Sequence, residues 1–353
     1  MKIFLLALIL FIGCKSPSDP IGIKISNEWH YETIDACRGI DISENVLVAA
    51  ASSNGYFRFN ITDADTLELV SHIPDINPNV GDDAAYDVLI SNNIQDMAFI
   101  LDDVDNIMVE FFNDGSTQIL DGCGNSLLYR SLTLNDDVFD KTILFTLQKH
   151  FDVLPADFDA YSTSVGVREF YYESIFGEDF FTETGCDAII NPNIEAMKIF
   201  YSDGLLSVAD GGLGVQIYQY NHDEDTLLDS LTSFYIQGGE ANSLFSIGNT
   251  VIGGFDNDRG CYIALLDSNG DIIGNLSFAE GYSINAIDYN SGTLALAAGN
   301  DGIIIYDWDE SLGLGLNGIL NVGSDNYVYD VKVYDDNIYV ASENGISIYK
   351  IGI

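Results

Sequence analysis

Seven polar residues recur at one position of a repeat in this 353-residue chain and could form a binding ring. Each stands at the start of a strand-forming segment, and the residue after it is Gly, Asp, Ser or Ala. The seven are Arg38, Tyr86, Arg130, Glu195, Asn242, Asn285 and Tyr329. Gathered around one axis, these side chains could hydrogen-bond a small polar ligand. The alternative is a solvated ring that only begins the strands.

A second candidate binding surface is an aromatic-rich segment at about residues 148–190, which makes the third repeat longer than the others. Its aromatic side chains are interleaved with carboxylates, and its candidate contact residues are Phe170, Tyr171, Tyr172, Phe176, Phe180 and Phe181. Long loops on rigid scaffolds often carry function, and aromatic groups dominate many protein interfaces. The segment could therefore stack on sugars or bind a protein. The alternative is a hairpin whose aromatic side chains pack against the sheet of its own repeat.

Clusters of aspartates raise the question of a metal site. They occur at 82–83, 102–105, 256–258 and 267–271, and such oxygen ligands suit Ca²⁺. None has the spacing of an EF-hand, and Asp-rich turns are also ordinary solvated turns. Ca²⁺ is therefore kept as a possible cofactor with no ligands assigned, and no other cofactor is expected.

Enzyme signatures are sparse. The sequence has neither a G-x-S-x-G elbow nor an HExxH motif, so no catalytic residue is assigned. One enzymatic alternative remains, a Ca-dependent, lactonase-like hydrolase with an axial metal site. There Glu195 and Asp87 would serve as metal ligand and base. The principal interpretation is a protein that binds and does not catalyse.

The N-terminus has the pattern of an export signal. Residues 1–13 hold a basic start and an apolar run that is too short to span a bilayer, which needs ~20 residues. The end of this run, Phe11-Ile12-Gly13-Cys14, resembles the lipobox of bacterial lipoproteins, although Phe11 stands where Leu is usual. The resemblance implies acylation of Cys14 and attachment to the membrane by the lipid alone. The alternative is an ordinary cleaved signal followed by an incidental cysteine.

Residues 14–22 would then be the acylated cysteine and a flexible tether. This organisation predicts a protein of the bacterial cell envelope. Lys15 is not the Asp that retains such lipoproteins at the inner membrane, so an outer-membrane address is favoured, with the periplasmic or surface side left open. Exported proteins can keep disulfides, but the pairing of Cys37, Cys123, Cys186 and Cys261 is also left open. The scattered histidines do not have the spacing of a zinc site.

The elements that must position the candidate residues are short strands in a regular repeat. The residues Ala209, Gly253, Ala297 and Ala341, which end the second strand of successive units, are each 44 residues apart. Gly, Asn and Asp turns join three strands per unit, because these residues tolerate the positive φ of tight hairpins. A fourth, polar strand fits between units, as at residues 66–70.

Seven such units predict an all-β fold, a seven-bladed β-propeller that forms one domain over residues 23–353. A four-stranded sheet cannot bury both faces alone, so the blades must stack in a ring. The last unit has only three strands, and the stretch at residues 23–33 can supply the fourth. An N-terminal strand would then close the last blade and leave no free edge. The alternative is a β-solenoid, whose rungs are usually shorter.

The charge balance excludes one class of partner. Thirteen Lys and Arg against 55 Asp and Glu give a formal net charge of −42, which repels the phosphates of nucleic acids. Salt screens such self-repulsion, so the acidity suits a saline or Ca²⁺-rich habitat. The alternative is a solvated acidic coat without a specific role. We expect a soluble, monomeric propeller domain.

Parts of the repeat resemble a known family. Tyr329-Asp330-Val331, the strand at residues 338–341 and the segment at 302–307 are similar to LVIVD-repeat β-propellers. The Asp-Pro that closes those repeats is absent, because Trp308 follows Asp307. The resemblance implies a secreted or surface propeller and transfers no catalytic residues. The sequence thus predicts a membrane-anchored, exported propeller that is a binding or scaffold module for protein or glycan partners.

Overall fold

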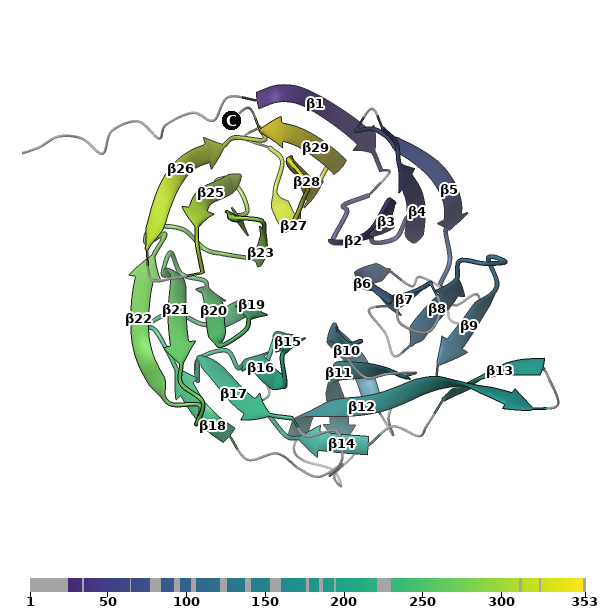
Figure 1. Ribbon diagram of the computed structural model, residues 1–353, viewed down its shortest axis with the longest axis horizontal. Coiled ribbons are helices and arrows are strands. Elements are labelled where there is room, and N and C mark those ends of the chain that lie inside the picture. The colour runs from purple at the N-terminus through teal and green to yellow at the C-terminus, as the bar shows by residue number, and fades with distance from the viewer. Residues whose placement is uncertain are drawn as a thin grey trace, which may run out of the picture.

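The structure is a computed structural model that describes most of the chain. The described residues are 25–33, 35–63, 65–76, 84–91, 96–102, 106–120, 126–136, 141–152, 160–175, 178–183, 187–193, 195–220, 230–310, 313–323 and 325–351. Within these ranges every regular element is a β-strand, and the strands form seven antiparallel sheets arranged as a ring (Figure 1). The predicted seven-bladed β-propeller is therefore confirmed.

Each blade begins with its innermost strand, beside the axis, and ends at the rim (Figure 1). Blades one to three comprise β2 (Gly39–Ser43), β3 (Val46–Ala50), β4 (Tyr56–Ile61) and β5 (Leu67–Ile73); β6 (Ala85–Ser91), β7 (Met97–Asp102), β8 (Ile107–Phe111) and β9 (Thr117–Leu120); and β10 (Ser126–Asn135), β11 (Lys141–Asp152), β12 (Ala160–Ile175), β13 (Glu178–Glu183) and β14 (Asp187–Ile190).

Blades four to seven follow the 44-residue period more closely. They comprise β15 (Lys198–Ser202), β16 (Leu205–Ala209), β17 (Val215–Gln219) and β18 (Ser230–Phe234); β19 (Ala241–Ile247), β20 (Thr250–Phe255), β21 (Gly260–Leu266) and β22 (Ile272–Phe278); β23 (Ala286–Asn290), β24 (Thr293–Ala297), β25 (Ile303–Trp308) and β26 (Leu314–Leu320); and β27 (Val328–Tyr334), β28 (Asn337–Ser342), β29 (Gly345–Ile351) and β1 (Ile25–Glu32).

The ring closes by pairing the two ends of the described chain. Strand β1 runs antiparallel to β29, with Trp29 opposite Ile348 and Glu32 opposite Gly345. This contact confirms the predicted N-terminal closing strand. Gly345 begins β29 with φ of 118°, and a Cβ there would lie 2.3 Å from the Tyr31 carbonyl oxygen. Glycine is therefore required at this position for two reasons, its backbone conformation and the close approach of β1.

The longer third blade is built around a long hairpin. Strand β12 has 16 residues, and its outer part pairs with β13 while its inner part pairs with β14. In Figure 1 the β12–β13 hairpin projects beyond the rim of the ring. The aromatic-rich segment thus extends this blade outward.

The hydrophobic core lies between the blades. The described residues form seven buried clusters, one at each interface between neighbouring blades. At the closing interface, Leu47 and Ala49 of blade one pack with Tyr339 and Ala341 of blade seven, and all four are at most 1 % exposed. Burying a side chain such as Leu47 stabilises the fold by about 1.5–3 kcal/mol. The closed ring therefore buries the seam between its first and last blades as completely as the others.

Candidate functional site: an axial cavity

The innermost strands of all seven blades surround one cavity at the propeller axis. Its volume is about 370 Å³, at the lower end of the range for small-molecule sites. Every blade contributes to its wall, from Arg38 and Ile40 of blade one to Asp330 and Lys332 of blade seven. Apolar side chains such as Leu132 and Leu244 alternate in this wall with polar and charged ones.

Six of the seven candidate ring residues line this cavity. They are Arg38, Tyr86, Arg130, Asn242, Asn285 and Tyr329. In four blades the ring residue lies at a break in strand register, namely at Tyr86, Arg130, Asn242 and Tyr329. Such β-bulges re-aim a side chain and are frequent beside functional sites. In blades one and six, Arg38 and Asn285 instead lie just before the strand, and their N–H groups bond to Ala50 and Ala297.

Glu195 does not take the ring position in blade four. There the N–H of Met197 donates to the carbonyl of Ala209, as Arg38 does to Ala50. Met197 therefore occupies the position that we had assigned to Glu195 from the sequence, two residues away. The ring consequently contains a thioether in place of a carboxylate. The error arose because the Ala that follows Glu195 resembles the small residue of the other repeats.

Glu195 lies at a second cavity of about 390 Å³. This cavity is lined by Lys149, Glu195, Met197, Gly211, Glu240, Ala241, Asn242 and Asp256. Met197 and Asn242 also line the axial cavity, so the two cavities share part of a wall. Asp87, the expected partner of Glu195 in an axial metal site, lines only the axial cavity. The structure therefore does not place these two carboxylates in one site.

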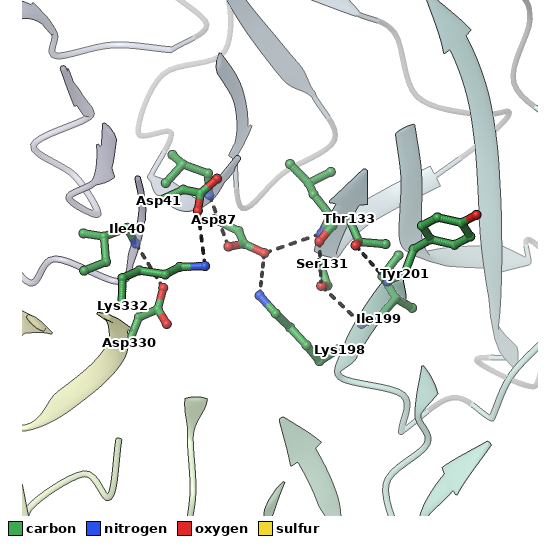
Figure 2. A network of polar contacts seen from close by, with 12 residues as sticks. Ile40, Asp41, Asp87, Ser131, Thr133, Lys198, Ile199, Tyr201, Asp330 and Lys332 are labelled. Carbon is green, nitrogen blue, oxygen red and sulfur yellow. Dashed lines mark hydrogen bonds and ion pairs between the residues drawn. The ribbon is translucent and has the colours of Figure 1, made fainter. Parts of the chain in front are cut away.

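Sequence reasoning missed a layer of charged side chains just inside the ring (Figure 2). Lys198 Nζ lies 2.8 Å from Asp87 Oδ2, and Lys332 Nζ lies 3.2 Å from Asp41 Oδ1. These residues stand one or three positions after a ring residue, so the alternation of an inner strand places them on the same face. That alternation is the signal that could have found them.

Carboxylates of this layer also join neighbouring blades. The N–H of Ile40 donates to Asp330 Oδ2 at 3.1 Å, and that of Ile90 donates to Asp41 Oδ2 at 2.8 Å. Equivalent bonds run from Leu132 to Asp87, from Val333 to Asp288, from Ile199 to Ser131 and from Tyr201 to Thr133, several of which Figure 2 shows. Each side chain pairs a backbone donor that the short inner strand leaves free. The layer therefore has a structural role in holding the cavity wall.

Burial shifts the protonation of the carboxylates in this layer. It raises the pKa of Asp330, and it raises the pKa of Asp288 to about 7 although Lys332 opposes the shift. For Lys332, burial disfavours the charge, but the nearby carboxylates of Asp41, Asp288 and Asp330 outweigh it and raise its pKa. Lys332 thus stays charged while Asp288 titrates near neutrality.

The two arginines of the ring differ from these lysines. Lys198 and Lys332 are paired with carboxylates, whereas neither Arg38 nor Arg130 forms an ion pair with a described residue. Arg38 lies over the ring of Tyr329, 4.2 Å from its centroid, and the Tyr329 hydroxyl donates to Glu343. Within the part of the chain that the structure describes, Arg130 Nε and Asn242 Oδ1 are buried without a hydrogen-bond partner.

The aromatic candidates of the third blade divide into three groups. Phe170 is fully buried and packs against Phe99, with ring centroids 5.2 Å apart, so it belongs to the core between blades two and three. Tyr171 is partly exposed. The backbones of Tyr172, Phe180 and Phe181 lie in the paired strands β12 and β13. Phe176 lies outside the described residues. Phe170 was therefore wrong as a surface contact, because its side of β12 faces blade two.

The expectations about metal sites, cysteines and the membrane anchor concern residues that the structure describes only in part. No group of three or more His, Cys, Asp and Glu side chains is arranged to hold a metal ion in the ranges given above. Cys37 and Cys261 are buried free thiols, and burial raises the pKa of both. Cys14, Cys123 and Cys186 lie outside the described residues. The described part of the chain also contains no helix with the length and apolarity needed to cross a membrane.

Comparisons with known proteins support the fold alone. No protein-family model and no curated protein sequence matches the chain, so the resemblance to LVIVD-repeat propellers stays a prediction. A solved structure of the computationally designed Ika8 protein is similar over 95 % of this chain and 100 % of its own, with a TM-score of 0.55 and 10 % identity. A chain in a structure of the mitotic checkpoint complex is similar over 96 % of both chains, with a TM-score of 0.61 and 11 % identity.

Proposed function

We propose that this protein is an exported, lipid-anchored binding module that holds part of a protein or glycan partner in its axial cavity. The fold is a β-propeller, an architecture that commonly serves as a protein-interaction scaffold, and a similar chain occurs in the mitotic checkpoint complex. The observation that carries the proposal is the axial cavity, which gathers polar residues from successive blades in a wall that also has apolar surface. Such a mixture is typical of ligand sites.

Unpaired polar atoms in the ring support a binding role more than a purely structural one. The side chains of the inner charged layer already form ion pairs and blade-to-blade hydrogen bonds. In the ring, by contrast, Arg130 Nε and Asn242 Oδ1 have no partner among the described residues. A buried polar group without a partner costs about 1–3 kcal/mol. A ligand that supplied the missing partners would recover that free energy.

The test compares two tryptophan variants. Asn242→Trp would fill the cavity, while Leu213→Trp would add the same side chain at an exposed position that lines neither cavity. Full-length protein would be extracted from cell envelopes and examined by native mass spectrometry. We expect a bound species on the wild type and on Leu213→Trp that is lost from Asn242→Trp. Equal retention by all three proteins would refute the axial site.

The proposed anchor has its own test. Cells that express the wild type would be labelled with palmitate beside cells that express Cys14→Ala. We expect label in the wild-type band, and its loss together with release from the membrane fraction in Cys14→Ala. Unlabelled wild-type protein would refute lipidation while leaving the cavity proposal untouched.

A further inference from the structure

The axial cavity is cationic in a protein that is otherwise strongly acidic. Four of the 13 Lys and Arg residues of the chain line it, namely Arg38, Arg130, Lys198 and Lys332. Among the residues that the structure describes, its lining has two carboxylates, Asp87 and Asp330. The wall therefore carries a formal excess of two positive charges, whereas the whole chain carries −42. The few cationic side chains of this acidic protein are therefore concentrated around a cavity that could enclose a ligand.

The excess charge belongs to the two arginines. Asp87 pairs with Lys198, and Asp41, which is not part of the lining, pairs with Lys332, so the lysines are locally balanced. With Asp41 counted, Asp330 remains against the two arginines, and the local excess is one positive charge. Arg38 and Arg130 have no such carboxylate among the described residues. Burial is the main cause that lowers the pKa of nearby Lys149; the charge of Arg130 adds to the shift, and Glu195 opposes it.

The rest of the ring suits hydroxyl groups. Asn242 and Asn285 provide amides on the blades away from the arginines. Asn242 Oδ1 has no partner among the described residues, whereas Asn285 Nδ2 already donates to the Val328 carbonyl and leaves its Oδ1 for a ligand. Tyr86, Tyr327 and Tyr329 provide aromatic surface in the same wall. Guanidinium groups bind carboxylates strongly, amides match hydroxyls, and aromatic rings pack on the apolar face of a sugar.

From this arrangement we infer that the axial cavity binds a carboxylate-bearing sugar, such as a uronic acid residue of an acidic glycan. The inference rests on the proposed function, because it names the ligand class of the proposed site. Arg38 and Arg130 hold the carboxylate, and Asn242 with Asn285 bonds the hydroxyls across the ring. A C-terminal peptide carboxylate would meet the same arginines, and its amide groups could pair with the asparagines, so the test below includes a peptide probe.

The test measures binding of matched probes to full-length protein by isothermal titration calorimetry. Glucuronate is compared with glucose, which lacks only the carboxylate function, and with acetyl-dialanine, which has a carboxylate but no hydroxyls. We expect glucuronate to bind at least tenfold more tightly than either. Arg130→Gln and Arg38→Gln should each weaken glucuronate binding at least tenfold. Lys350→Gln, which removes a cation paired with Asp65 outside the cavity, should not.

The outcomes separate this inference from the proposed function. Equal binding of glucose and glucuronate, or stronger binding of the peptide, would overturn the sugar-acid assignment. So would failure of glucuronate to bind. If Asn242→Trp still lost the species retained from envelopes, the axial site itself would stand and only its ligand class would be wrong. If Asn242→Trp retained that species, the proposed function would fail as well.

Discussion

Lys198 of blade four donates a hydrogen bond from Nζ to Oδ2 of Asp87 of blade two, at 2.8 Å and across 111 positions of the sequence. The N–H of Leu132, in the inner strand of blade three, donates to the same Asp87 oxygen at 3.4 Å. Figure 2 shows both bonds meeting at one carboxylate. One side chain therefore ties three consecutive blades together beneath the ring of candidate ligand contacts.

Breaking this pair should destabilise the propeller. Lys198→Met leaves the carboxylate of Asp87, whose side chain is only 9 % exposed, without its cation. The Lys198 side chain is itself 35 % exposed, so the cost is that of a buried charged group left without its partner, about 1–3 kcal/mol. Urea unfolding should show a loss of this size for Lys198→Met and a smaller loss for Lys198→Met with Asp87→Asn. Additive losses from the two substitutions would mean that the ion pair is energetically unimportant.

Asp288 should make stability depend on pH. Its pKa is about 7 in the folded protein against an ordinary value of 3.8, and burial is the main cause. The folded state therefore holds more protons than the unfolded state between about pH 4 and pH 7, so the free energy of unfolding falls as pH rises through that window. Asp330 and Asp41 favour the protonated form of Asp288, while Lys332 opposes it.

The variant Asp288→Asn removes this titration. Its thermal midpoint should fall less between pH 5 and pH 8 than that of the wild type, and at pH 8 it should be at least as stable. Some slope should remain, because the pKa of Asp330 is also raised. A variant with the wild-type pH slope would show that Asp288 does not titrate in this range.

The closing seam should depend on Gly345. An alanine there must adopt φ of 118° and place its Cβ 2.3 Å from the Tyr31 carbonyl oxygen. Backbone strain of this kind costs about 1–3 kcal/mol, and the contact adds to it. Gly345→Ala should lower the thermal midpoint and speed proteolysis of the N-terminal strand. Gly204→Ala is the control, since its φ of 82° is also positive but nothing lies within 4 Å of its added Cβ. Equal losses in the two variants would mean that strain, and not contact with β1, matters.

A buried ion pair between blades one and two offers a further test. Glu110 is fully buried, accepts a hydrogen bond from the Tyr56 hydroxyl at 2.7 Å and lies 3.4 Å from an Arg58 nitrogen. Glu110→Gln leaves the guanidinium uncompensated, so we expect a loss of about 3–5 kcal/mol in urea unfolding. Combining it with Arg58→Met should restore part of that stability. No restoration would mean that the uncompensated guanidinium does not carry the cost.

Much of the fold could be predicted because each repeat consists of strand-forming segments separated by turn-forming residues. The fixed spacing of Ala209, Gly253, Ala297 and Ala341 placed four blades, and the short last unit predicted the closing strand. The register of blade four could not be read in the same way, because Glu195-Ala196 imitates the start of an inner strand. Only the hydrogen bond from Met197 to Ala209 decides it.

The ring residues of the candidate site could be predicted from the sequence, whereas the charged layer beside them could not. The ring residues share one repeat position, so the sequence could show them together. The residues one and three places later differ from blade to blade, from Gly39 to Asp87 to Lys198, and their charges are balanced only by residues of other blades. Phe170 shows the same limit, because the burial of one face of β12 depends on its neighbour Phe99.

The most direct measurement is a crystal structure of the full-length protein purified from cell envelopes, determined without added ligand. The account predicts density for a bound carboxylate-bearing molecule in the axial cavity, with an oxygen within hydrogen-bonding distance of Arg38 or Arg130. A cavity that contains only water, beside a partner bound elsewhere on the propeller, would contradict it.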